Sequence, residues 1–156
     1  MKMNGKIIAG PTPEVIVIPK GETEYIFQAM PVLNYDEFDK ICPVPTPPQI
    51  VKRGGEKVND YEDKDYNTNL TTWAQNKNSW LILTSLQATE GLEWDTVNMA
   101  EPDTWKNYEA ELKVNFTEIE ISLIMDKVHD ACGLNQTKID EATKRFLAGR
   151  EEVPSS

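Results

Sequence analysis

The chain has 156 residues, of which 39% are hydrophobic and 27% are charged. These proportions are typical of a soluble globular protein with one domain, or with a small domain and an appendage. The formal net charge of −10 argues against nucleic acid as a partner, because contacts to phosphate dominate that affinity. No apolar run approaches the roughly 20 residues of a membrane span, so we expect no membrane partner.

Residues 1–42 have the pattern of short strands followed by one short helix. The run 6–9 is short and mostly apolar, 14–18 is rich in β-branched residues, and 25–30 follows after turn formers, so we predict a β-hairpin or small antiparallel sheet. Asn34 is placed to cap a helix over 35–41 that ends before Pro43. A lone hairpin is marginal in water, so this part must pack on the rest of the chain or on another chain.

The segment 43–60 has the composition of a connector. Its four prolines favour extended polyproline II geometry, and the Gly54-Gly55 pair is typical of a flexible turn. The prolines also resemble the PxxP ligand of an SH3 domain, but we favour a semi-rigid spacer. We therefore expect residues 1–42 to form an arm that reaches away from a separate body.

Residues 61–149 have the pattern of a helical body of about four helices. From about residue 61, Tyr66, Trp73 and Trp80 share one stripe of 3.6-residue period, and Gly91 suits the C-cap region of this helix. All four tryptophans lie in this part of the chain, where we expect them to form the core.

Three further helices are predicted from their start signals. Pro102 suits a first helical turn, Thr117 and Glu120 have the spacing of a capping box, and Asn135 can cap a last helix that ends at Gly149. Residues 150–156 form a polar tail. The predicted fold class is α+β, with a hairpin arm, a proline-rich spacer and a helical body.

Few residues could support chemistry. His129 is the single histidine, and Asp126 and Asp130 fall near it on one helical face, with Cys132 as one further possible metal ligand. We interpret His129 instead as a surface residue near a helix C-terminus, where its charge suits the dipole. We expect no metal, no cofactor and no catalytic residue, and we expect Cys42 and Cys132 to be free thiols.

Three segments together resemble one protein family. They are the strand-rich start with NGK, the helix NYDEFDKIC and the ending IDEATKRFLAGR, in which KRFLAG spans 144–149. Their order resembles that of the tail assembly chaperones of long-tailed bacteriophages. The resemblance implies a non-enzymatic protein of the host cell cytoplasm that binds the hydrophobic tape-measure protein while tail-tube subunits polymerise around it.

Two non-enzymatic functions are therefore expected, with a metal-dependent protein built on His129 as a third. The first is a phage assembly factor that binds a tape-measure or tail-tube protein. The alternative is a structural virion subunit, such as a tail, connector or decoration protein, that stays in the particle. The partner-binding candidates are Tyr25 and Phe27 in the hairpin and Phe146 and Leu147 in the last helix. Packing on the protein's own core competes with that role, and the oligomeric state stays open.

Overall fold

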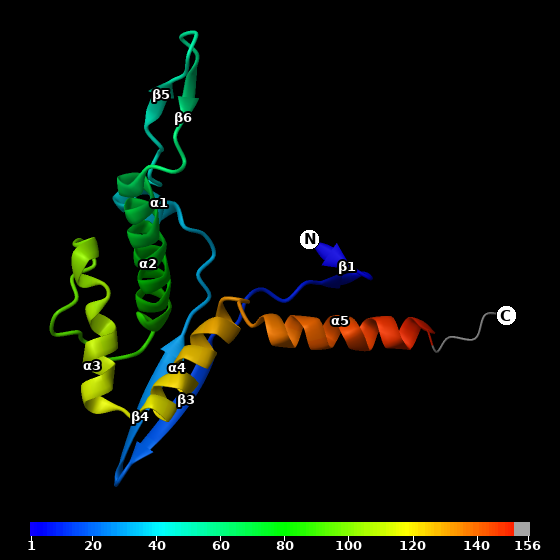
Figure 1. Cartoon of the computed structure of the whole chain (residues 1–156). Coiled ribbons are helices and arrows are strands. Elements are labelled where there is room, and N and C mark those ends of the chain that lie inside the picture. The colour runs from blue at the N-terminus through cyan, green and yellow to red at the C-terminus, as the bar shows by residue number, and fades with distance from the viewer. Residues whose placement is uncertain (152–156) are drawn as a thin grey trace.

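A computed structural model of the chain describes residues 1–151 and has an α+β architecture (Figure 1). Small antiparallel sheets occupy the first part of the chain, and most of the helical residues follow them, so the predicted fold class is confirmed. Residues 152–156 of the predicted polar tail lie outside the described residues. No helix within residues 1–151 is both long enough and apolar enough to cross a membrane.

The largest sheet is the hairpin of β3 (Glu14–Lys20) and β4 (Thr23–Ala29). Gly21 makes its tight turn with a φ of +61°, a backbone conformation that favours glycine. One face of the hairpin is buried through Ile18, Phe27 and Ala29, which join the same hydrophobic core as α2 (Lys64–Leu86) and α4 (Glu118–Ala131). The hairpin is therefore part of the body.

The expected division into an arm and a body is wrong for this reason. The N-cap of helix α1 (Asp36–Ile41) is Tyr35 and not the predicted Asn34, whose Oδ1 accepts a hydrogen bond from the Asp36 N–H just before the helix. The helix places Phe38 in the centre of the core. The ring centroid of Phe38 lies 5.9 Å from that of Trp73 and 5.8 Å from that of Trp80. Residues before the proline-rich segment thus share one core with the helices after it.

Helix α2 begins later and ends earlier than predicted. Its N-cap is Asp63, whose carboxylate accepts a hydrogen bond from the Tyr66 N–H, and its last residue is Leu86. The chain leaves the helix through Gln87, so Gly91 is not its C-cap but a residue of the following turn, with a φ of +74°. The predicted stripe faces inward, and Trp80 is buried at its centre.

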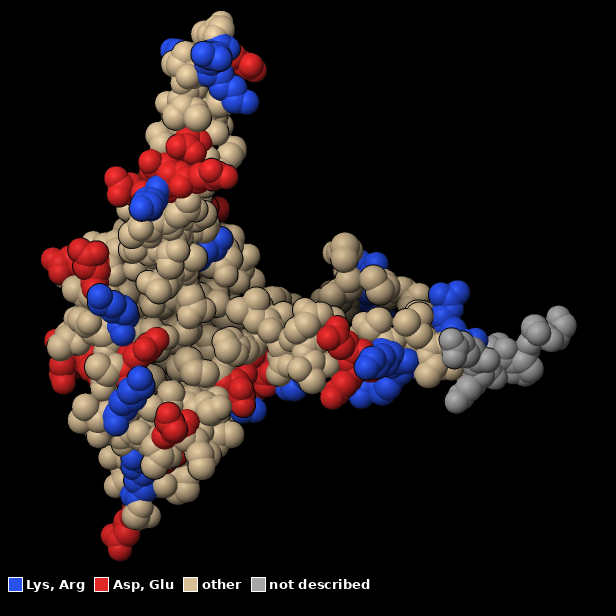
Figure 2. Space-filling view, in the orientation of Figure 1, with Lys and Arg blue, Asp and Glu red and all other residues tan. Residues whose placement is uncertain are grey.

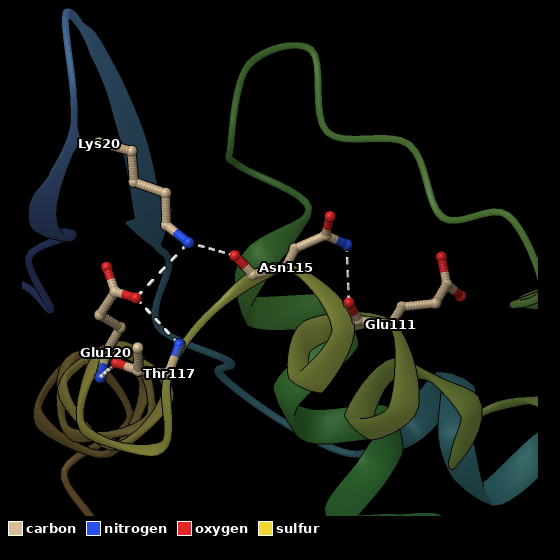
Figure 3. Close-up of polar contacts among 5 residues, drawn as sticks. All are labelled: Lys20, Glu111, Asn115, Thr117 and Glu120. Carbon is tan, nitrogen blue, oxygen red and sulfur yellow. Dashed lines mark hydrogen bonds and ion pairs between the residues drawn. The ribbon is translucent and has the colours of Figure 1, made fainter.

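Two shorter helices pack beside α2. Pro102 opens a short 3-10 helix (Pro102–Thr104), and α3 (Asn107–Asn115) follows it. The predicted capping box at the start of α4 is confirmed (Figure 3): Thr117 Oγ1 accepts the Glu120 N–H at 3.2 Å, and Glu120 Oε1 accepts the Thr117 N–H at 2.9 Å.

Three other segments, two small hairpins and a helix, project from the core (Figure 1). The strands β1 (Lys2–Met3) and β2 (Lys6–Ile7) pair only with each other, so the first strand does not extend the β3–β4 sheet. The expected spacer contains a hairpin of β5 (Gln49–Val51) and β6 (Lys57–Asn59), with Gly54-Gly55 in its turn. Helix α5 (Gln136–Glu151) continues past Gly149, and its residues 136–150 are exposed, so it is not packed in the body.

Candidate protein-binding surface

The outer face of the β3–β4 hairpin carries an apolar cluster although it faces solvent. Val15, Val17 and Ile26 are 47%, 46% and 53% exposed, and Val17 lies directly opposite Ile26 in the register. An antiparallel sheet with one covered face normally carries polar residues on the other. The continuous apolar run 15–18 in β3 already contained this signal, since a strand with one wet face alternates apolar and polar residues.

On the edge of β4 that faces away from β3, some backbone groups are already hydrogen-bonded to α2 and to the turn after it. Gln28 donates its N–H to Thr89 Oγ1 at 3.0 Å and accepts from the same hydroxyl at 3.1 Å. Backbone groups alternate in direction along an antiparallel strand, so Ile26 and Glu24 direct theirs to the same side as Gln28. Within residues 1–151 no other protein group hydrogen-bonds to them there. The free edge of β4 is thus two residues long.

A groove of about 430 Å³ lies beside this free edge. Residues 24–28 of β4 form one wall and residues 89–92 after α2 form the other. Its charged lining residues are Glu24 and Glu90, while Ile26 and Leu92 contribute apolar surface. An extended segment with apolar and basic side chains therefore complements this groove in shape and charge.

Tyr25 connects the groove to a smaller hollow of about 250 Å³ that reaches Phe116 and Leu92. The rings of Tyr25 and Phe116 meet edge to face, with centroids 6.0 Å apart. Tyr25 is 45% exposed, so it presents both an apolar ring edge and a phenol to a bound segment.

Lys20 fixes the turn end of the hairpin to the helices (Figure 3). Its ammonium donates to the backbone oxygen of Asn115, lies 3.5 Å from Glu120 Oε1 and sits 4.4 Å from the centre of the Phe116 ring. The backbone hydrogen bond from Thr117, aided by Lys20, holds the pKa of Glu120 below its ordinary value. Both ends of β4 are thus anchored, one by Lys20 and the other by Ser85 and Thr89.

The loop that forms the second wall is also held in place. The carboxylate of Glu111 accepts hydrogen bonds from the N–H groups of Asp95 and Thr96, at 2.6 Å and 3.1 Å, and from the Thr96 hydroxyl. Burial opposes ionisation of Glu111, but the hydrogen bonds from Thr96 and Asp95 outweigh it and lower the pKa. The groove is therefore preformed, which reduces the entropy cost of binding.

The predicted partner-binding residues fall into three environments. Tyr25 lines the groove, whereas Phe27 is 6% exposed and belongs to the core, so its selection as a surface residue is corrected. Phe27 is buried because it packs edge to face against Phe116, with ring centroids 5.4 Å apart. Phe146 and Leu147 are exposed on α5, which points away from the hairpin (Figure 1), so the four residues do not form one surface.

The predicted metal candidates have other contacts. Asp130 accepts hydrogen bonds from Lys138 Nζ at 2.8 Å and from Asn135 Nδ2 at 2.9 Å, which fix the start of α5 and lower the pKa of this carboxyl. Among the described residues, no cluster of three or more His, Cys, Asp or Glu side chains is placed to hold a metal ion. Cys42 and Cys132 are both free thiols.

No family model, curated protein or solved structure matches the chain.

Proposed function

We propose that this protein is a non-enzymatic assembly factor that binds an extended segment of a partner protein by strand addition to β4. The proposal rests on one observation: the backbone N–H and C=O groups of Glu24 and Ile26 point away from β3 and face a preformed groove. In strand addition, main-chain hydrogen bonds supply affinity, and pockets for alternate side chains supply specificity. Tyr25 and the acidic lining would then select apolar and basic side chains.

The proposed partner is a phage structural protein, either the tape-measure or the tail-tube protein, in the host cell cytoplasm. Two features support this choice. The order of elements resembles the tail assembly chaperones, and the exposed apolar side chain of Ile26 beside the groove suits a partner with a hydrophobic surface. A net charge of −10 helps to keep the free protein dispersed while apolar side chains of the hairpin are exposed.

The alternative function is a structural virion subunit that stays in the particle. The projecting helix α5 favours it, because its exposed Phe146 and Leu147 have no contact partner in the core and could dock permanently on a neighbour. Stoichiometric detection by mass spectrometry in purified particles would establish the subunit. Absence from particles, with co-purification of the tape-measure protein from infected cells, would establish the assembly factor.

A matched pair of proline variants tests the binding edge itself. Ile26→Pro removes an outward N–H of β4 while leaving the β3–β4 ladder intact, and Val17→Pro makes the same change directly across the hairpin on the edge of β3. Each variant is co-expressed with the tape-measure and tail-tube proteins of the same gene cluster, and the captured partner is quantified. We expect Ile26→Pro to lose the partner and Val17→Pro to retain it. Equal capture by both variants would refute binding at β4.

A further inference from the structure

The β5–β6 hairpin lacks the support that a small sheet normally needs. Each strand has three residues, and every residue of the two strands is exposed except Val58, which is partly buried. The hairpin stands beyond the start of α2 (Figure 1). An isolated two-stranded hairpin is marginal in water, and three or more strands are needed for independent stability. Its geometry therefore favours pairing with further strands.

The outer edge of β6 is suited to such pairing. Lys52 N–H donates to Glu56 O at 2.8 Å, and Asp60 N–H donates to Pro48 O at 2.7 Å, so these residues face each other across the hairpin. By the alternation of an antiparallel ladder, Lys57 and Asn59 direct their backbone groups outward from β6. The opposite edge begins after Pro47-Pro48, where an amide donor is missing, whereas the β6 edge contains no proline.

The charges around this hairpin are opposite at its two ends. We call Lys52, Arg53, Glu56 and Lys57, with a net charge of +2, the basic tip, and Asp60, Glu62, Asp63, Lys64 and Asp65 at the base of the hairpin, with a net charge of −3, the acidic collar. Figure 2 shows the basic tip above a band of acidic residues. Within residues 1–151 neither group takes part in an ion pair. A charge distribution of this kind is complementary to itself when two copies lie antiparallel.

We propose that two copies of this chain pair through β6, antiparallel and centred on Val58, to form a four-stranded sheet. Lys57 of each copy then lies opposite Asn59 of the other, and both direct their backbone groups toward the new ladder. Ile50 is directly opposite Val58 within the hairpin, so pairing at Val58 aligns a row of Ile50, Val58, Val58 and Ile50 across one face.

The charges fit the same arrangement. Antiparallel pairing brings the basic tip of each copy beside the acidic collar of the other, twice per dimer. Such an interface is isologous, which is the commonest symmetry among soluble oligomers. It does not involve β4, so it leaves the proposed partner-binding groove open in both copies. The two proposals can therefore fail independently.

Two charge variants give a decisive test. The first, with Lys52→Glu and Arg53→Glu, has an acidic tip and an acidic collar. The second, with Glu62→Lys and Asp65→Lys, has a basic tip and a more basic collar, and it keeps Asp63, the N-cap of α2. We expect each variant alone to dimerise at least about tenfold more weakly than the wild type, because tip and collar then repel. Mixed in equal amounts, they should restore a heterodimer.

The measurement is sedimentation velocity over a concentration series at low and high salt, with circular dichroism to verify folding. Lys144→Glu with Arg145→Glu is the matched control, since it reverses the other basic doublet, on α5, and should leave the dimer unchanged. The wild-type dimer should weaken with salt, because exposed charge pairs are screened. A monomeric wild type, variants that still dimerise alone, or a mixture that stays monomeric would each overturn the proposal.

Discussion

Replacing Phe38 with alanine tests whether the hairpin, α1 and the helices form one cooperative core. Phe38 is 0% exposed, and its ring lies 5.9 Å from Trp73, 5.8 Å from Trp80 and 6.2 Å from Trp105 between centroids. Removing a buried Phe side chain costs about 3–5 kcal/mol, from lost transfer free energy and the cavity left behind. We expect about 4 kcal/mol, because three indole rings lose their central contact together.

This loss is large relative to the total stability of about 5–15 kcal/mol for a typical domain. For a chain of this size it corresponds to a fall in melting temperature of about 8–16 °C. Urea unfolding followed by tryptophan fluorescence measures it directly, since Phe38 contacts three of the four tryptophans. Phe146→Ala is the matched control, because Phe146 is 63% exposed and its loss should change stability by less than about 0.5 kcal/mol.

A cost below about 1 kcal/mol for Phe38→Ala would contradict a single cooperative core. A tryptophan transition that keeps the wild-type midpoint while a second transition moves would also contradict it. Either result would mean that residues 1–42 fold apart from the helices.

Three further predictions follow from individual contacts. Trp80→Ala should cost about 3–5 kcal/mol, because Trp80 is buried, whereas Lys52→Ala in the projecting hairpin should leave the urea midpoint unchanged. Thr89→Val removes both hydrogen bonds to β4 and should cost about 1–3 kcal/mol, while Thr89→Ser should cost less because it keeps the hydroxyl; thermal unfolding of both would show it. The pKa of Glu120 is lowered on folding, chiefly by the Thr117 N–H, so its stabilising contribution is present above its ordinary pKa of 4.5 and is lost as pH falls through the lowered pKa. The difference in urea midpoint between wild type and Glu120→Gln should accordingly shrink at acid pH, and a constant difference would contradict this assignment.

Elements that depend only on residues close together in the sequence were predicted correctly. The capping box of Thr117 and Glu120 and the inward stripe around Trp80 needed only nearby residues, and both are present. Hairpin β3–β4 was also predictable, because turn formers separate two apolar runs.

Non-local packing decided the features that the sequence did not reveal. Whether Phe27 faced solvent depended on Phe116, which is 89 residues away in the chain and packs against its ring. The strands β5 and β6 have three residues each, too few to show a period, and the surrounding prolines and glycines indicated a connector. Tyr25 was identified as a surface candidate, but the groove beside it is formed by residues 89–92, whose position no local pattern indicated.

Hydrogen–deuterium exchange on the complex with the tape-measure or tail-tube protein reports strand addition to β4 at the level of single amides. Strand addition to β4 predicts slowed exchange at the amides of Glu24 and Ile26, which donate to no acceptor within residues 1–151, and unchanged exchange at Val15 and Val17 on the other edge. Protection confined to α5, with none at Glu24 and Ile26, would contradict the account and identify the exposed helix as the docking element.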